Sequence, residues 1–147
     1  VITKDYGVVP CIHPHHNTMV MHEDEIDFIM KNTDPEYIAF GPDTAHLAVG
    51  LCDPVKVMEK YAERIKFLHL KDYYFGEYVG SEGIGYENVN VYQNFRELGE
   101  GNIDFKKVFK VLKDVNYDGY MCTELDGSRF GNKISAEMNY KYVSDNY

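Results

Sequence analysis

The segment YIAFGPDTAHL, residues 37–47, runs apolar from Tyr37 to Phe40 and then reaches a carboxylate, Asp43, and a histidine, His46. Strand interiors rarely hold charge, so we interpret this run as a buried strand that ends at Asp43. Three further apolar runs also end on polar side chains: YGVVPCIHP at 6–14, IKFLHLKD at 65–72 and GYMCTELD at 119–126. The sequence therefore predicts four strands, each with a polar group at its carboxyl end.

Helical periodicity follows each of these runs. Asp53 and Pro54 form an N-cap and a first helical residue, the usual start of a helix. The other apolar helix faces are Ile26, Ile29 and Met30 within 22–33; Phe105, Val108, Phe109 and Leu112 within 102–115; and Ile134, Met138 and Tyr142 near the end. Alternating strands and helices indicate an α/β fold with a parallel sheet.

Four βα units make half of a (β/α)8 TIM barrel, whose usual length is about 250 residues. We therefore expect residues 1–147 to be the C-terminal half of a single TIM-barrel domain, with no second domain. Such a half would expose two unpaired sheet edges. The expected partners are the missing N-terminal half of the barrel or a second copy of the chain.

Composition restricts the function. The chain has 147 residues and a net charge of -9, which would repel nucleic-acid phosphates and argues against nucleic-acid binding. No apolar run approaches the roughly 20 residues that span a membrane. The cysteines Cys11, Cys52 and Cys122 lack C-x-x-C spacing, so we expect buried free thiols and a reducing, cytoplasmic location.

The polar strand ends predict a metal site. His13, Asp43, His69 and Glu124 end the four runs, and the carboxyl ends of barrel strands share one rim. Each residue has a structural alternative: His69 as a core histidine, Asp43 as a turn cap, Glu124 as an ion-pair partner of Lys71 or Arg129. Because all these alternatives would have to coincide, we favour one shared site. Its ligands suit Mn2+, Co2+, Mg2+ or Zn2+.

Several motifs carry a family resemblance. HPHHNT, NTDPEYIAFGPDTAHL, RIKFLHLKD, ELGEGNIDF and YDGYMCTELD together resemble the xylose-isomerase-like TIM barrels of the sugar phosphate isomerase/epimerase group, and most closely inosose dehydratase-like proteins. The resemblance maps the chain onto strands 5 to 8 of the barrel. It implies one divalent metal ion held by Asp43, His69 and Glu124, with His46 near the substrate.

The fifth-strand end departs from the family pattern. Many members have a glutamate there, whereas this sequence reads IHPH, so His13 or His15 would supply the fourth ligand. If Ile12 packs on the helix side, alternation sends His13 into the barrel and makes it the better candidate. His15, beyond Pro14, would then reach the substrate.

The resemblance implies a divalent-metal-dependent lyase or isomerase that acts on a keto-polyol or ketose through an enediolate, most closely an inosose dehydratase-like activity. Lys71 would neutralise an oxyanion or assist the departing hydroxyl, or else form an ion pair with Asp72 or Glu124. The base stays open among Glu124, His15, His46 and Asp126. The expected site therefore has Glu124, His46 and Lys71 in catalysis and His15, His46, Lys71 and Asp126 at the substrate.

Three other functions are weighed. A sugar phosphate isomerase or 3-epimerase is less favoured, because family epimerases use a fifth-strand glutamate that is missing here. A non-catalytic sugar-binding barrel is a second alternative. An endonuclease IV-type DNA repair enzyme is disfavoured, because that group carries further histidine ligands and this chain is acidic.

Two segments are predicted to be loops. The segment from Tyr73 to Arg96 is rich in glycine and tyrosine and is interpreted as a lid over the substrate, or as a surface loop or subunit contact. The LGEG stretch, 98–101, predicts a turn in which Gly99 and Gly101 permit positive φ.

Overall fold

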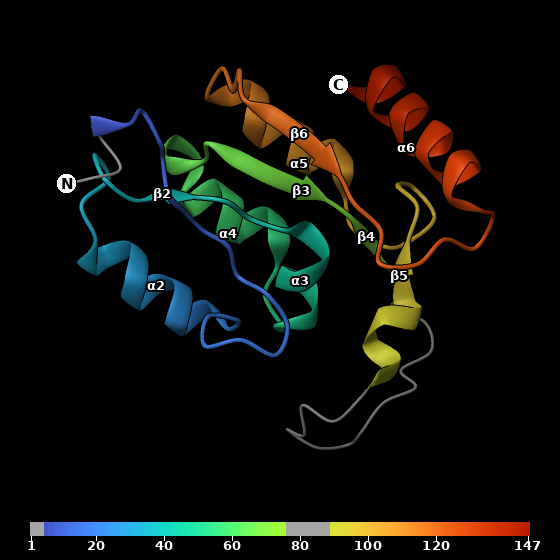
Figure 1. Ribbon diagram of the computed structural model, residues 1–147, viewed down its shortest axis with the longest axis horizontal. Coiled ribbons are helices and arrows are strands. Elements are labelled where there is room, and N and C mark those ends of the chain that lie inside the picture. The colour runs from blue at the N-terminus through green and yellow to red at the C-terminus, as the bar shows by residue number, and fades with distance from the viewer. Residues whose placement is uncertain (1–4, 76–88) are drawn as a thin grey trace.

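The computed structural model describes residues 5–75 and 89–147 (Figure 1). The strands are β1 (Cys11–Ile12), β2 (Ala39–Phe40), β3 (Phe67–Leu70), β4 (Asp72–Tyr73), β5 (Phe95–Arg96) and β6 (Tyr120–Thr123). The helices are α2 (Glu23–Asn32), α3 (Thr44–Val49), α4 (Pro54–Lys60), α5 (Phe105–Asp114) and α6 (Asn132–Asn146), with 3-10 turns η1 (Ala62–Arg64) and η2 (Val89–Asn94). Most of the expected lid, residues 76–88, lies outside the described residues.

The principal strands run parallel in the order β1, β2, β3, β6. β1 pairs with β2, and β3 pairs with β6. Two isolated parallel bridges, Phe40 with Ile65 and Asp43 with His69, join β2 to β3. This succession of parallel strands confirms the predicted α/β architecture, and it brings the carboxyl ends of all four strands to one side.

The strands are shorter than the apolar runs predict. β1 covers Cys11–Ile12 rather than 6–13, because Pro10 and Pro14 on either side have no N–H to donate to a ladder. β2 begins at Ala39 rather than Tyr37, since the N–H groups of residues 37 and 38 both donate to the carbonyl of Asp34. Apolar sequence marked the strands but not their ends.

The segment after Asp43 forms helix α3, with Asp43 as its N-cap. The capping role that is the structural alternative for Asp43 is therefore present, at a helix rather than at a turn. Asp53 caps α4 in the same way and accepts hydrogen bonds from Val55 N and Lys56 N. A side-chain acceptor at an N-cap satisfies orphan N–H groups and stabilises a helix by about 1 kcal/mol.

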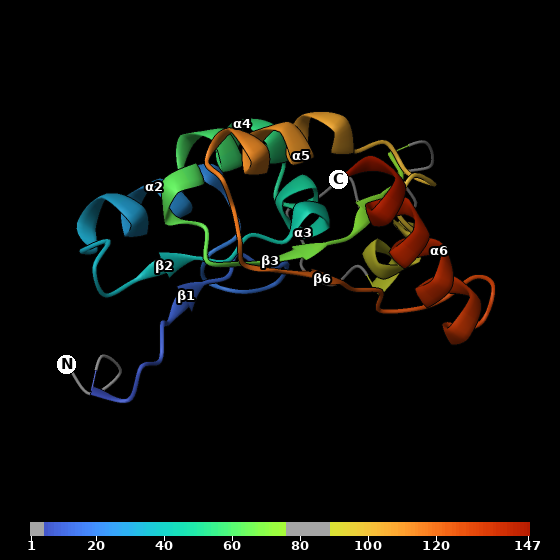
Figure 2. The same ribbon diagram turned by 90° about the horizontal axis from the view of Figure 1, so that it is seen from above.

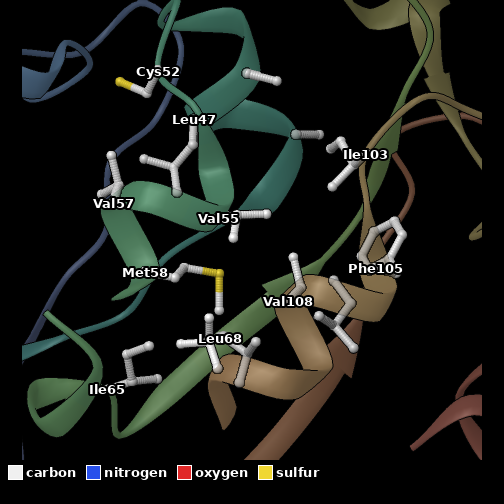
Figure 3. Close-up of a cluster of buried hydrophobic side chains, with 14 of the residues drawn as sticks. Leu47, Cys52, Val55, Val57, Met58, Ile65, Leu68, Ile103, Phe105 and Val108 are labelled. Carbon is white, nitrogen blue, oxygen red and sulfur yellow. The ribbon is translucent and has the colours of Figure 1, made fainter. Parts of the chain in front are cut away.

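Helices α2, α3, α4 and α5 lie on one side of the strands, and α6 stands beside one end of them (Figure 2). α4 and α5 pack together over β3, where Met58, Leu68 and Val108 are fully buried (Figure 3). Burying an aliphatic side chain of this size stabilises a fold by about 1.5–3 kcal/mol. The predicted inward face of α5, which comprises Phe105, Val108, Phe109 and Leu112, is buried and therefore confirmed.

Helix α6 docks differently. Tyr142 packs against the core, but Ile134 is 52% exposed. Its buried face carries Ser135 and Asn139, and Asn139 Oδ1 accepts a hydrogen bond from Leu98 N at 2.8 Å. The prediction that Ile134 faces the core is wrong, because the side chains that face the core at this end of α6 are polar and apolar spacing cannot identify them.

The chain after β3 contains a pairing that the sequence did not reveal. Asp72 pairs with Arg96, and Tyr73 with Phe95, so β4 and β5 form an antiparallel ladder at the two ends of the segment interpreted as a loop. Two-residue strands are too short for a recognisable period. Next to this ladder, Gly99 adopts φ 86° as predicted, whereas Gly101 is not among the glycines with positive φ.

All three cysteines are free, as predicted. Cys52 is buried, and burial raises its pKa to about 11, whereas Cys11 and Cys122 are only partly buried. Among the described helices, none has the length and apolar character needed to cross a membrane.

Candidate active site

Asp43 lies at the centre of the predicted cluster. Its Oδ1 accepts hydrogen bonds from the N–H groups of Ala45 and His46, both at 2.9 Å, so the helix cap fixes the carboxylate. The other oxygen, Oδ2, is buried and has no well-formed hydrogen bond within the described residues. Its neighbours are Lys71 Nζ at 3.4 Å and His69 Nδ1 at 3.5 Å. Asp43 therefore caps α3 with one carboxylate oxygen and presents the other to Lys71 and His69.

His13 and His69 stand beside this oxygen. The candidate ligand atoms of His13, Asp43 and His69 all lie within 4.8 Å of one another. Ile12 packs against the helix-side core, so alternation turns His13 to the opposite face, as the sequence argument required. His13 Nδ1 lies 2.7 Å from the carbonyl oxygen of Gly41, which leaves Nε2 as the free nitrogen.

Glu124 joins the cluster from the end of β6. Its Oε2 lies 2.8 Å from His69 Nδ1 and 2.9 Å from Lys71 Nζ. The register places His69 opposite Cys122, so Glu124 follows two residues beyond His69 on the neighbouring strand. Glu124 therefore lies against His69, whereas the candidate ligand atoms that are all within 4.8 Å of one another belong, among the described residues, to His13, Asp43 and His69.

Lys71 is a fully buried cation among carboxylates. Besides Asp43 and Glu124, its Nζ contacts Asp126 Oδ2 at 2.8 Å. The ammonium also lies 4.7 Å from the ring centroid of Phe95. Of the two alternative ion pairs, Lys71 forms the one with Glu124. The Asp72 carboxylate instead accepts hydrogen bonds from the N–H groups of Tyr73 and Gly99.

His46 and His15 stack at 3.6 Å between ring centroids. His46 is 1% exposed, its Nδ1 accepts a hydrogen bond from His16 N at 3.2 Å, and its Nε2 lies 3.4 Å from Lys71 Nζ. His15 is only partly buried and lies over it. A substrate would therefore meet His15 before His46.

The electrostatics follow from burial and charge. Burial lowers the pKa of His13, and it also lowers the pKa of His46 to about 3, so both imidazoles are neutral at physiological pH. Burial acts to raise the pKa of Asp43, but His69 and the Lys71 cation hold it below its ordinary value. Burial acts to lower the pKa of Lys71, yet the surrounding carboxylates raise it overall.

Arg129 and Glu97 form a pair that the sequence did not suggest. Arg129 was considered as a partner of Glu124, but its Nε lies 3.1 Å from the buried Glu97 and its Nη2 lies 3.4 Å from Glu100. Ser135 donates a further hydrogen bond to Glu97 at 2.6 Å. These contacts tie the loop after β6 to the LGEG loop and give Glu100 a partner.

Comparison with known proteins adds independent information. A family model described as xylose isomerase-like TIM barrel matches residues 1–142. The inosose dehydratase of Geobacillus kaustophilus is 33% identical over 127 residues, which cover 85% of this chain and 41% of that protein. The inosose dehydratase of Clostridium beijerinckii is 35% identical over 127 residues, with 85% and 43% covered. The chain thus spans about two-fifths of the length of these curated relatives.

Solved structures give a consistent result. A sugar phosphate isomerase/epimerase from Parabacteroides distasonis superposes with a TM-score of 0.67 at 26% identity, covering 97% of this chain and 46% of that one. The IolI protein, solved with a bound zinc atom, gives a TM-score of 0.72 at 16% identity and covers 98% and 50%. The second likeness is one of fold alone.

Proposed function

The chain belongs to the xylose isomerase-like TIM barrel family, and from that premise we propose that the protein is a metal-dependent enzyme that eliminates water from a keto-polyol. The relatives named inosose dehydratase support this class of substrate and reaction. The observation that carries the proposal is the group of His13, Asp43 and His69, with Glu124 in contact with both His69 and the buried Lys71.

The donors in this cluster fit a divalent cation. Asp43 Oδ2 is a buried oxygen without a well-formed hydrogen bond in the described part of the chain. The bond between His13 Nδ1 and a backbone carbonyl is the arrangement that orients metal-binding histidines. Two imidazoles and two carboxylates suit Zn2+, Mn2+ or Co2+. We propose that these four residues hold one such ion, which when bound supplies Lewis-acid polarisation of a substrate carbonyl.

Lys71 would act through its charge. Its raised pKa keeps the ammonium protonated, so it stabilises negative charge on a substrate oxygen better than it gives up a proton. In the elimination a carbon next to the carbonyl loses its proton to a base, and the electron pair of that C–H bond forms a double bond to the next carbon. The hydroxyl on that next carbon departs with its bonding pair and leaves as water, taking a proton from the protonated base or from solvent. Glu124, Asp126 and His15 are the partly exposed candidates for the base.

His46 would serve as support for these groups. Because it is buried and neutral, with Nδ1 already bonded to the backbone, we propose that it acts through His15 and Lys71. Direct contact with the substrate would require His15 to move aside.

The sheet also suggests a structural partner. Within the described residues β1 pairs only with β2, and β6 only with β3, so both outer edges are free. We propose that strands from an N-terminal half of the barrel, or from a second copy of the chain, pair with these edges. Native-like unfolding of a monomer of residues 1–147 alone would contradict this.

The test uses the full-length protein. Elemental analysis should find stoichiometric divalent metal, and a screen of keto-inositols and ketohexoses with Mn2+ or Co2+ should find loss of water from a keto-inositol. Rearrangement of a ketose without loss of water would favour the isomerase or epimerase alternative. Absence of both metal and turnover would favour a non-catalytic sugar-binding barrel.

A further inference from the structure

Lys71 occupies a gap between two ladders. β3 ends at Leu70, which pairs with Thr123 of β6, and β4 begins at Asp72, which pairs with Arg96 of β5. The strand changes neighbours at Lys71, so neither ladder includes its backbone N–H or C=O. Buried backbone groups almost always have partners, and Lys71 is fully buried. The partner must come from elsewhere.

Thr44 provides both hydrogen bonds. Its Oγ1 donates to the carbonyl oxygen of Lys71 at 2.6 Å and accepts from the N–H of Lys71 at 3.0 Å. A hydroxyl can donate one bond while it accepts another, which matches this double contact. Thr44 is 0% exposed and begins α3 directly after Asp43, so the turn that presents the Asp43 carboxylate also presents this hydroxyl.

The residue after Lys71 is held from the other side. The buried Asp72 carboxylate accepts four backbone hydrogen bonds at 2.8–3.1 Å, from the N–H groups of Tyr73, Gly99, Gly101 and Ile103. The main chain at Lys71 is thus fixed by Thr44 on one flank and by Asp72 on the other. Only the side chain of Lys71 remains to be placed.

We propose that Thr44 is a positioning residue for Lys71. A lysine ammonium is carried on four flexible methylenes, so the side chain alone does not fix its position. A fixed backbone limits the region that the ammonium can reach. With the backbone held, Nζ meets Asp43 at 3.4 Å, Glu124 at 2.9 Å and Asp126 at 2.8 Å. Without the Thr44 hydroxyl, the gap between the ladders opens and the ammonium is no longer confined to this position.

The first test measures Lys71 directly in the full-length protein, by amide hydrogen exchange and by mass spectrometry after labelling of lysine amines. In the wild type the Lys71 amide should exchange slowly and its amine should resist labelling. Thr44→Val keeps the shape but removes the hydroxyl and both of its hydrogen bonds to Lys71. It should raise both rates at least about tenfold, since the loss of even one of these bonds costs roughly 1.4 kcal/mol. Thr44→Ser should restore both.

Thr33→Val is the matched control. Thr33 Oγ1 also makes one donated bond, to Ile29 O at 2.8 Å, and one accepted bond, from Arg64 Nη2 at 2.9 Å, but it lies at the end of α2. Its loss should leave exchange and labelling at Lys71 unchanged. Equal responses in Thr33→Val and Thr44→Val would show a general loosening and overturn the proposal.

The second test is kinetic and rests on the proposed function. Thr44→Val should lower kcat by about tenfold to a hundredfold with little change in KM, because small misplacements of a reacting group cost rates of this order, and Thr44→Ser should recover most of it. If the wild type turns over no substrate, the proposed function fails, while exchange and labelling still decide the role of Thr44. If Thr44→Val does not fold, fast exchange at Lys71 in the wild type overturns the proposal, and slow exchange in both wild type and Thr44→Ser supports it.

Discussion

Replacing Lys71 by methionine should destabilise the protein strongly. The substitution keeps a long unbranched side chain but removes the cation that faces Asp43, Glu124 and Asp126. Lys71 and Asp43 are both 0% exposed, so the variant would leave a carboxylate buried without its cation. Burial of an unpaired charge, more than the lost attraction itself, determines the expected effect.

The expected loss of unfolding free energy in Lys71→Met depends on how exposed each carboxylate partner is. Removing one member of a buried ion pair costs about 3–5 kcal/mol. Glu124 and Asp126 are 39% and 28% exposed, so water screens their charges and they add little to the loss. Because the pKa of Lys71 is raised in the folded state, its stabilisation is complete below the unfolded pKa of about 10.4 and fades only as pH rises through the folded value.

The assay is urea unfolding of the full-length protein at neutral pH in the presence of a chelator. With a slope of about 2 kcal/mol per molar urea, the midpoint of Lys71→Met should fall by about 2 M. Adding Asp43→Asn should recover part of the loss, because the unpaired charge disappears.

Lys60→Met is the matched control. Lys60 also faces two carboxylates, Glu23 at 3.2 Å and Asp27 at 2.6 Å, but its side chain is 38% exposed. Exposed ion pairs contribute little to stability, so its midpoint should barely move. Equal midpoint shifts for the two lysine variants would refute the reasoning from burial.

Three further predictions concern other parts of the molecule. His13→Ala should lower bound metal measured by elemental analysis, whereas His15→Ala should mainly raise KM; full metal content and turnover in His13→Ala would exclude it as a ligand. Gly101→Ala should lower the urea midpoint, because a Cβ there would lie 2.3 Å from Asp72 Oδ1, and an unchanged midpoint would show that the loop can shift. Asp27, whose pKa is lowered by hydrogen bonds from neighbouring side chains, contributes stability that is present above about pH 3.9 and lost as pH falls; thermal melts of Asp27→Asn should depend less on acid, and identical acid profiles would disprove this.

The polar residues that follow the strands could be predicted, although the exact strand bounds could not. An apolar run that stops at a polar residue marks the end of a buried strand, and parallel strands bring such ends together. The sequence predicts that His13, Asp43, His69 and Glu124 lie close together. The structure brings candidate ligand atoms of the first three within 4.8 Å of one another and places Glu124 Oε2 2.8 Å from His69 Nδ1. The role of these residues as ligands is still a prediction.

The supporting contacts could not be predicted in the same way. Thr44 and Lys71 are 27 residues apart, and Glu97 and Arg129 are 32 apart, so no local period connects them. Each pair joins two segments that are close only in the folded chain, and neither segment's own sequence indicates its partner. The same reason explains why the polar docking of α6 was missed.

The arrangement of the site allows metal binding to be separated from turnover. All four proposed ligands lie at the ends of β1, β2, β3 and β6, so the ion would need no other element to complete these four contacts. A bound substrate must also be enclosed on the side away from the helices. No described helix covers the face of the strands opposite α4 and α5 (Figure 2). If further strands enclose the substrate, substitutions that disrupt strand pairing at the outer edges of β1 and β6 should abolish turnover while the protein retains its metal. Loss of metal in those edge variants would mean that the ion, too, depends on closure of the barrel.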